Sequence, residues 1–268
     1  MTITTFLPLL ATAMLALADT PLPRAHGGCD ADLACLGAEF GSADALAGWR
    51  QFHDVEGWPS MTRRLEVNAA SGELHLEPTT SGWYADFHAP FVFREVAGDF
   101  TVTTRLRADG LAGGLPRAAW SLAGLMVRAP RQVTPRTWTA GGEDWLFITT
   151  GVADDVSRPV IETKTTRHSQ SRLRLHAARA GWVELRVTRR GASFELASRW
   201  DGEEWVVRDR FERGDLPATL QVGINAYTDW YSTTALQSDP LRFNTTVVTD
   251  GKPDLGVRVD WIRFARPD

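Results

Sequence analysis

Apolar and polar residues alternate through positions 221–230, which read Gln-Val-Gly-Ile-Asn-Ala-Tyr-Thr-Asp-Trp. A period of two places successive side chains of a β-strand on opposite faces of a sheet. The Val, Ile and Ala at the even positions therefore share one face. The opposite face carries Asn225, Tyr227 and Asp229, and Trp230 follows directly.

The same alternation recurs along most of the chain and predicts roughly a dozen strands. No segment has the pattern of an amphipathic helix of about ten residues or more. Turn residues separate the apolar segments about every 8–12 residues, which indicates an all-β fold, a two-sheet sandwich or a barrel. The clearest strand segments are 65–67, 74–76, 82–90, 98–107, 121–130, 145–151, 159–165, 173–175, 183–187, 194–196 and 257–264.

Two hairpins have specific signals in the sequence. The segments 65–67 and 74–76 flank turn residues at 68–72, and Asp201-Gly202 lies between Trp200 and Trp205. Asp-Gly between aromatic-rich segments is typical of a tight hairpin turn. Residues 46–52 fit either a short turn of helix or the first strand.

The first 18 residues differ from the rest of the chain. They contain no charged side chain, carry an apolar run and end in Ala16-Leu17-Ala18. This stretch is too short to span a bilayer, and it is typical of a signal peptide; a disordered or buried tail is the alternative. We expect an exposed segment at 19–36, a single β-sandwich domain at 37–268 and a secreted or periplasmic protein.

The chain has two cysteines, Cys29 and Cys35. In an exported protein such a pair predicts a local disulfide that closes a small loop. The alternative is a pair of metal ligands, which would need two further ligands at suitable spacing, and none is evident.

Charge and composition narrow the range of partners. The net charge is −4, and no polycationic stretch is present, which argues against a nucleic-acid partner. No segment after residue 18 is long and apolar enough for a membrane span. The chain has 11 Trp and only three Tyr. Many of these indoles must belong to the core, but any surplus at the surface would provide platforms for stacking.

Several segments together resemble a known superfamily. The motifs are Gly98–Val102, Ala123–Arg128, Trp145–Val152, Trp200–Trp205, Val222–Ala226 and Val259–Phe264. In this order they resemble the concanavalin A-like lectin/glucanase superfamily, and within it most of all the regulation-of-enolase-like family; they cover most of 40–264. The resemblance implies a jelly roll of two curved antiparallel sheets, with ligand sites usually on the concave sheet. It implies no particular reaction, because the fold hosts lectins, glycosidases, lyases and inert modules.

The outward-facing polar residues form a candidate ligand groove if their strands are neighbours in the concave sheet. In the segment 82–90 we expect Trp83, Ala85 and Phe87 on the inner face. Ordinary solvated faces, with charges paired across strands, are the alternative for all of these positions. The candidate groove consists of Tyr84, Asp86, His88, Arg128, Glu162, Lys164, Asn225, Tyr227 and Asp229, with Trp145 and Trp230 as stacking platforms.

Familiar catalytic and metal-binding patterns are missing. Retaining glycosidases of this fold typically carry Glu-x-Asp-x-x-Glu, which the sequence lacks, and Glu203 and Glu204 point to opposite faces of a hairpin. No Gly-x-Ser-x-Gly motif occurs, and the histidines show no metal-ligand spacing. Asp260 resembles a position that holds a structural calcium in some relatives, but the other oxygen ligands are not evident. We therefore expect no cofactor and no metal site.

These observations favour a carbohydrate-binding protein whose glycan stacks on Trp and is bonded by the polar groove. The first alternative is a polysaccharide-degrading enzyme, either a hydrolase or a lyase. Its acid and base would be Glu162 with Asp86 or Asp229, helped by His88 and Tyr227, and Arg128 or Lys164 would face a uronate. The second alternative is a structural or interaction module with an empty groove.

Overall fold

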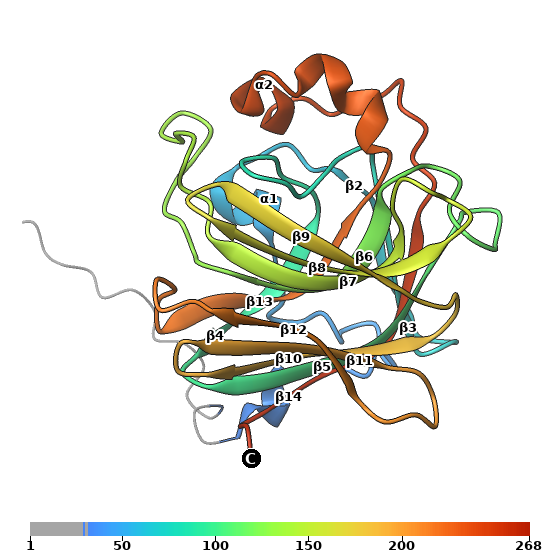
Figure 1. Ribbon diagram of the computed structural model, residues 1–268, viewed down its shortest axis with the longest axis vertical. Helices are drawn as coiled ribbons and strands as arrows, with labels where there is room; N and C mark the ends of the chain where they lie inside the picture. The colour runs from blue at the N-terminus through green and yellow to red at the C-terminus, as the bar shows by residue number, and fades with distance from the viewer. Residues whose placement is uncertain (1–28, 30–31) are drawn as a thin grey trace, which may run out of the picture.

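The computed structural model describes residue 29 and residues 32–268, and these residues form a two-sheet antiparallel β-sandwich, as predicted (Figure 1). Four helical segments are present in this part of the chain, η1 Leu33–Leu36, α1 Phe52–Glu56, η2 Trp230–Leu236 and α2 Pro240–Asn244. The strands are β1 Arg50–Gln51, β2 Thr62–Asn68, β3 Glu73–Pro78, β4 Phe91–Ala97, β5 Phe100–Asp109, β6 Ser121–Arg128, β7 Trp145–Val152, β8 Pro159–Arg167, β9 Gln170–Ala177, β10 Val183–Arg190, β11 Ser193–Arg199, β12 Val206–Glu212, β13 Thr219–Tyr227 and β14 Gly256–Ala265.

Each sheet has seven strands. Sheet A has the order β12-β11-β10-β5-β14-β3-β2, and sheet B has the order β1-β4-β13-β6-β7-β8-β9. The apolar faces of the two sheets meet in one core, to which β5 contributes Val102 and Leu106, and β6 contributes Leu125 and Val127. This packing accounts for the period-two pattern, because one face of most strands points into the core.

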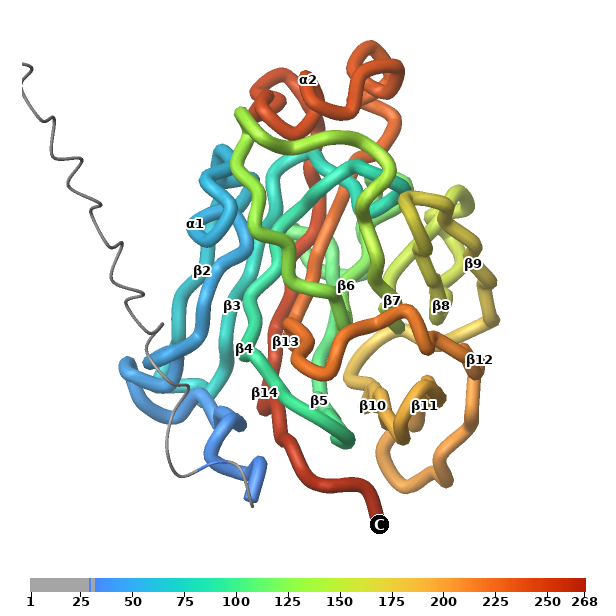
Figure 2. The backbone as a smooth tube through the Cα atoms, turned by 90° about the vertical axis from the view of Figure 1, so that its left-hand side faces the viewer, coloured from blue at the N-terminus to red at the C-terminus, as the bar shows by residue number. Residues whose placement is uncertain are grey.

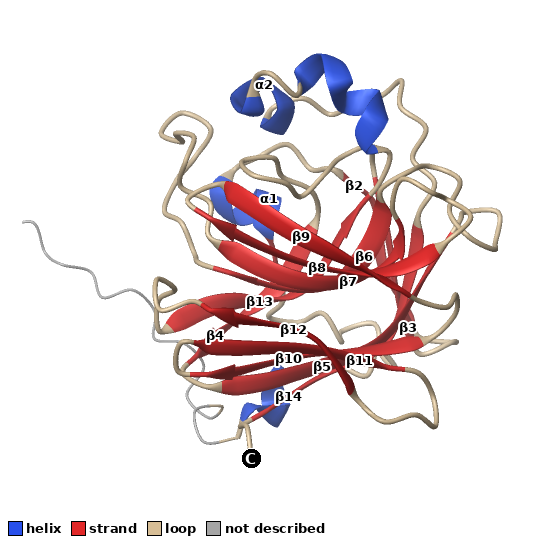
Figure 3. Ribbon diagram, viewed as in Figure 1, coloured by secondary structure: helices blue, strands red, loops and turns tan. Residues whose placement is uncertain are grey.

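The outer faces of the sheets differ. In β5 of sheet A, buried and half-buried residues alternate, whereas every residue of β6 and β7 in sheet B is buried. Loops and the helices α1, η2 and α2 lie over the outer side of sheet B; α2 is at the top of Figures 1 and 3, α1 lies lower beside the strands, and Figure 2 shows α2 at the same end from another side. The central strands of sheet B are therefore covered on both faces.

Both predicted hairpins are confirmed. Leu65 of β2 pairs with Leu76 of β3, and β11 pairs with β12 across the turn at Asp201-Gly202. The segment 46–52 contains a turn, the short strand β1 and the start of α1.

One predicted strand segment is wrong, and another, 221–230, is a strand only as far as Tyr227. Residues 82–90 form an irregular loop in which Tyr84 bridges to Phe87 and Ala85 has a φ of 50°, so the expected alternation of faces does not exist. The strand β13 ends at Tyr227, and Asp229, with a φ of 61°, caps η2. Asp229 therefore does not continue the row of Asn225 and Tyr227. Long-range packing overrode the local pattern in both places.

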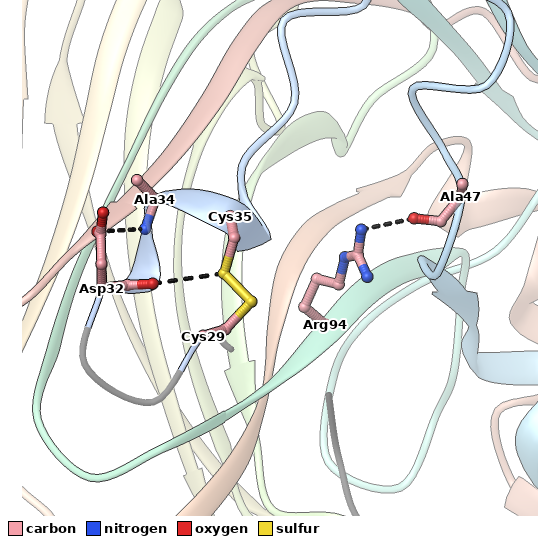
Figure 4. Close-up of a disulfide and its surroundings, with 6 residues drawn as sticks. All are labelled: Cys29, Asp32, Ala34, Cys35, Ala47 and Arg94. Atoms are coloured by element: carbon pink, nitrogen blue, oxygen red, sulfur yellow. Dashed lines mark hydrogen bonds between the residues drawn. A yellow bond between two sulfur atoms is a disulfide. The ribbon is translucent and has the colours of Figure 1, made fainter. Parts of the chain in front are cut away.

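The disulfide between Cys29 and Cys35 is confirmed, with the two Cα atoms 5.9 Å apart (Figure 4). It adjoins η1, where Asp32 accepts a hydrogen bond from the Ala34 N–H and Leu33 and Leu36 pack into the core. The end of the predicted exposed segment 19–36 is thus partly buried. The predicted signal peptide, 1–18, lies outside the described residues. Within the described chain no helix is long and apolar enough to cross a membrane.

Candidate binding pocket on sheet B

The outer face of sheet B is mostly filled by aromatic side chains. Trp145 stacks on Phe147 with ring centroids 5.2 Å apart and planes 4° apart, and Trp83 packs edge-on against Trp145 at 6.0 Å. Trp145 has no exposed surface. The expectation of Trp145 as a stacking platform is therefore wrong, because the loop that carries Trp83 covers it.

Arg128 lies in the same layer and is completely buried. Its guanidinium donates to Glu56 Oε1 at 2.7 Å, to both Glu143 oxygens at 2.9 and 3.0 Å, and to Gln221 Oε1 at 3.0 Å. Burial alone would raise the pKa of Glu143, but the charge of Arg128 and its hydrogen bonds outweigh this effect and hold that pKa well below its usual range. Arg128 thus joins α1 and the loop before β7 to the sheet and is inaccessible to a ligand.

Four more residues of the predicted groove are buried or hydrogen-bonded within the protein and do not face the pocket. His88 is buried among aromatic rings, with Nε2 3.3 Å from Glu143 Oε1. Asp86 accepts bonds from the Gly141 N–H and the Ser169 hydroxyl, and Asp229 accepts bonds from Thr80, Ser232 and the Lys252 N–H. Asn225 is buried, and its amide has no hydrogen-bond partner among the described residues. These four residues lie outside the lining of the pocket described next.

A pocket of about 370 Å³ remains open on the outer side of sheet B. Lys164 of β8, Leu173 of β9 and Tyr227 of β13 come from the sheet, and the rest of the lining comes from loops and from η2. The lining consists of Gly82, Trp83, Tyr84, Trp120, Asp154, Lys164, Leu173, Tyr227, Trp230, Tyr231 and Gln237.

The floor of the pocket is a buried polar chain. The Lys164 ammonium donates to the Trp83 carbonyl at 3.0 Å and lies 2.9 Å from Glu162, which also accepts a hydrogen bond from the Tyr227 hydroxyl. Burial, together with the neighbouring charge of Glu162, raises the pKa of Tyr227 well above its usual range. Tyr227 is therefore a protonated donor at neutral pH, and Glu162 balances the charge of Lys164.

Aromatic rings form the walls. Tyr84 is 42 % exposed and Tyr231 is 57 % exposed, and Trp230 packs between Tyr84 and Phe87. Gly82 permits this arrangement, because a Cβ at that position would lie 2.3 Å from the Trp230 ring. The pocket thus presents several partly exposed rings around a polar floor.

Asp154 fastens two of the wall residues. It accepts hydrogen bonds from Trp120 Nε1 at 2.7 Å and from the Tyr231 hydroxyl. The backbone of Trp120 has a φ of 56°, a conformation that is costly for a bulky residue and often occurs at functional sites. The Trp120 indole is therefore held in place by both the side-chain bond and the surrounding backbone.

Of the predicted set, the structure brings Tyr84, Lys164, Tyr227 and Trp230 together at one pocket, with Glu162 directly beneath. The sequence interpretation missed Trp120, Asp154, Tyr231 and Gln237. These residues lie in loops or in η2, where no periodic pattern predicts which way a side chain points. The surplus of indoles was the one signal that pointed toward an aromatic-walled site.

No group of three or more His, Cys, Asp or Glu residues suited to a metal ion occurs among residues 29 and 32–268. Asp260, the candidate calcium ligand, accepts a bond from Arg105 at 2.8 Å on the outer face of sheet A. Its carboxylate is therefore part of an ion pair.

No protein-family model matches the sequence, and no curated protein matches it. Solved structures share the fold. A functionally unknown protein from Saccharomyces cerevisiae matches with a TM-score of 0.52 at 16 % identity, over 83 % of this chain and 98 % of that one. A pseudo β-1,3-glucanase of Mycobacterium tuberculosis matches with a TM-score of 0.50 at 13 % identity, over 87 % and 98 %.

A GH43 protein from Bacillus licheniformis matches with a TM-score of 0.57 at 14 % identity, over 87 % of this chain but only 39 % of its own length. At these identities the likeness concerns the fold. The protein therefore belongs to the class of two-sheet β-sandwiches, and its solved neighbours include glycoside hydrolase proteins and a protein of unknown function.

Proposed function

We propose that the protein is a carbohydrate-binding β-sandwich that binds a glycan in the aromatic-walled pocket on sheet B. The observation that carries the proposal is the pairing of partly exposed rings, Tyr84, Trp230 and Tyr231, with polar groups that remain available to a ligand. Sugar rings have apolar faces that stack on aromatic side chains and hydroxyls that need fixed donors and acceptors.

The polar groups around the pocket suit sugar hydroxyls. Lys164 has three N–H donors; one is donated to the Trp83 carbonyl, and Glu162 is the ion-pair partner of the ammonium. Gln237 uses its amide N–H groups on the Trp230 carbonyl and Thr233, so its carbonyl oxygen is an acceptor for the ligand. Tyr84 contributes a phenol at the rim.

The solved neighbours support the same proposal through their titles, which name GH43 and glucanase-type proteins. They also support placing the chain in the concanavalin A-like superfamily, and the motifs quoted above favour the regulation-of-enolase-like family within it. The disulfide Cys29–Cys35 supports a secreted or periplasmic location, since disulfides persist in oxidising compartments.

The arrangement of carboxylates favours binding over hydrolysis. Glycosidases place two carboxyl groups across the scissile bond. Among the described residues that line this pocket, Asp154 is the single carboxylate. Glu162 has no exposed surface and is already bound by the Tyr227 hydroxyl and paired with Lys164. The raised pKa of Tyr227 also opposes its use as a lyase base.

A glycan array followed by calorimetry on the best ligand tests the proposal. We expect Trp230→Ala and Tyr231→Ala to weaken binding by at least about fivefold, because loss of one stacking partner costs about 1–3 kcal/mol. Val206→Ala is the matched control, since Val206 is an exposed apolar residue on the edge strand β12 of sheet A. Binding that is unchanged in both pocket variants, or an array on which no glycan binds, would overturn the proposal.

The enzyme alternative rests on Asp154 and Lys164, which both line the pocket, and on the hydrolase titles of the neighbours. Release of reducing ends or of unsaturated products from a polysaccharide panel tests it. Product formed by the wild type and abolished in Asp154→Asn would establish catalysis, and the absence of product across the panel would leave the binding proposal alone.

A further inference from the structure

The charges around the pocket do not balance. The Lys164 ammonium lies 2.9 Å from Glu162, so these two charges cancel. Asp154 accepts its two hydrogen bonds from neutral donors, the Trp120 indole and the Tyr231 phenol, and both bonds go to Oδ1. Among the described residues Asp154 has no ion-pair partner. The pocket therefore carries one net negative charge, with Oδ2 of Asp154 left to face a ligand.

The aromatic walls of the pocket, like its net negative charge, favour a positively charged ligand. The faces of Trp and Tyr rings attract cations, and the effect is largest when water is partly excluded. The pocket already shows this behaviour, because Lys164 Nζ lies 5.6 Å from the centroid of the Tyr84 ring and 5.9 Å from that of Trp120. Trp120 and Tyr231 direct their N–H and O–H donors at Asp154, and no cation among the described residues neutralises this carboxylate.

We propose that the glycan recognised here is an amino sugar, whose protonated amine pairs with Asp154 between the rings of Trp120 and Tyr231. This inference rests on the proposed glycan-binding function and narrows its ligand class. It also sets uronates aside, since Arg128 is buried against Glu56 and Glu143 and Lys164 is already paired. An acidic sugar would meet Asp154 without a free cation to offset the repulsion.

The test compares two oligosaccharides of equal length by calorimetry at slightly acidic pH, β-1,4-linked glucosamine and β-1,4-linked N-acetylglucosamine. Acetylation removes the charge and leaves the rest of the sugar in place. Because Asp154 and Tyr231 are exposed, we expect the glucosamine oligomer to bind about two- to fivefold more tightly, the size of one exposed cation contact. Equal affinity, or tighter binding of the acetylated oligomer, would overturn the inference.

The variant Asp154→Asn keeps an oxygen to accept the Trp120 and Tyr231 bonds but removes the charge. We expect it to bind both oligomers with similar affinity, whereas Asp155→Asn should keep the preference for the glucosamine oligomer. Asp155 is the matched control because it lies on the same loop, bonds to Ser157 and Arg158, and is not part of the pocket lining. A preference that survives in Asp154→Asn would overturn the assignment to Asp154.

The outcomes separate the inference from the function on which it rests. If the protein binds a neutral glycan of the array and shows no preference for the amine, the inference fails and the proposed function stands. If no glycan binds, both fail. The comparison of the two oligomers on the wild type decides the amino-sugar preference even where a variant does not fold.

Discussion

On the outer face of each sheet an arginine pairs with two carboxylates beside an aromatic ring, but the two arginines differ in their exposure to water. On sheet A, Arg105 pairs with Asp201 and Asp260 and lies 4.6 Å from the ring of Trp182. On sheet B, Arg128 pairs with Glu56 and Glu143 and lies 4.6 Å from the ring of Phe52. The side chain of Arg105 is 23 % exposed, whereas that of Arg128 is fully buried.

The two clusters have similar partners but differ in exposure to water. This comparison shows that burial beneath the loops, and not the choice of partners, decides how much the ion pairs contribute to stability. Water screens the charges around Arg105, so each pair there contributes at most about 1 kcal/mol. Under the loops on sheet B the same charges interact strongly, and each depends on the others to offset the cost of burial. One outer face is a solvated surface, and the other is a second, partly polar core with a pocket at one end.

The largest expected effect comes from breaking the buried cluster. Arg128→Met leaves Glu56 and Glu143 buried without a cation and should lower the free energy of unfolding by about 3–5 kcal/mol. Arg105→Met, the matched change on sheet A, should cost about 1 kcal/mol or less. Urea unfolding of the two variants measures the difference. Equal losses would show that the loops leave sheet B as hydrated as sheet A.

Low pH should lower the stability of the protein mainly through the buried ion cluster on the outer face of sheet B. The pKa of Glu143 in the folded protein lies well below 4.5, its ordinary value, so its contribution to stability is complete above about pH 4.5 and is lost as the pH falls through that value toward the folded pKa. We expect the urea midpoint to be flat above about pH 5 and to fall steeply below it.

Two variants check the origin of this acid dependence. Glu143→Gln should make the fall shallower. Asp201→Asn should leave it unchanged, because Asp201, whose pKa is lowered chiefly by the bond from Arg105, is exposed and screened by water. The same steep fall in Glu143→Gln would place the acid sensitivity elsewhere in the molecule.

A smaller effect is expected at the pocket. Tyr227→Phe removes the donor to buried Glu162 and should cost about 1.5–3 kcal/mol, the range for hydrogen bonds to a charged group. Tyr231→Phe removes a comparable phenol–carboxylate bond, to Asp154, at an exposed position and should cost about 0.5 kcal/mol or less. Thermal unfolding of both variants is a direct comparison. A larger loss in Tyr231→Phe would contradict the burial argument.

The smallest effect concerns salt. At about 1 M salt, where charges more than about 3 Å apart are screened in water, the cost of Arg105→Met should fall toward zero. The cost of Arg128→Met should remain, since salt does not enter the covered layer. Repeating the urea unfolding in high salt gives both values. A salt-sensitive Arg128 variant would indicate that ions reach the cluster.

Much of the fold was predictable because the information is local. Alternation predicted most strands of the sandwich, and turn residues predicted the hairpin that joins 65–67 to 74–76; the register of Leu65 against Leu76 came from the structure. The candidate site was only partly predictable. Lys164 and Tyr227 followed from strand periodicity, whereas Trp120, Asp154 and Tyr231 lie in segments without a period.

By itself the sequence determined most of the strands, which of their faces is apolar and which two cysteines pair, since each of these depends on near neighbours in the chain. It did not determine what lies over the opposite face. A polar residue at an outward position has the same pattern whether water or a loop covers it, as Arg105 and Arg128 illustrate. Only the tertiary structure brought Glu56, Glu143 and the loop 82–90 onto sheet B, because burial of their aromatic and charged groups is a long-range property of the folded chain.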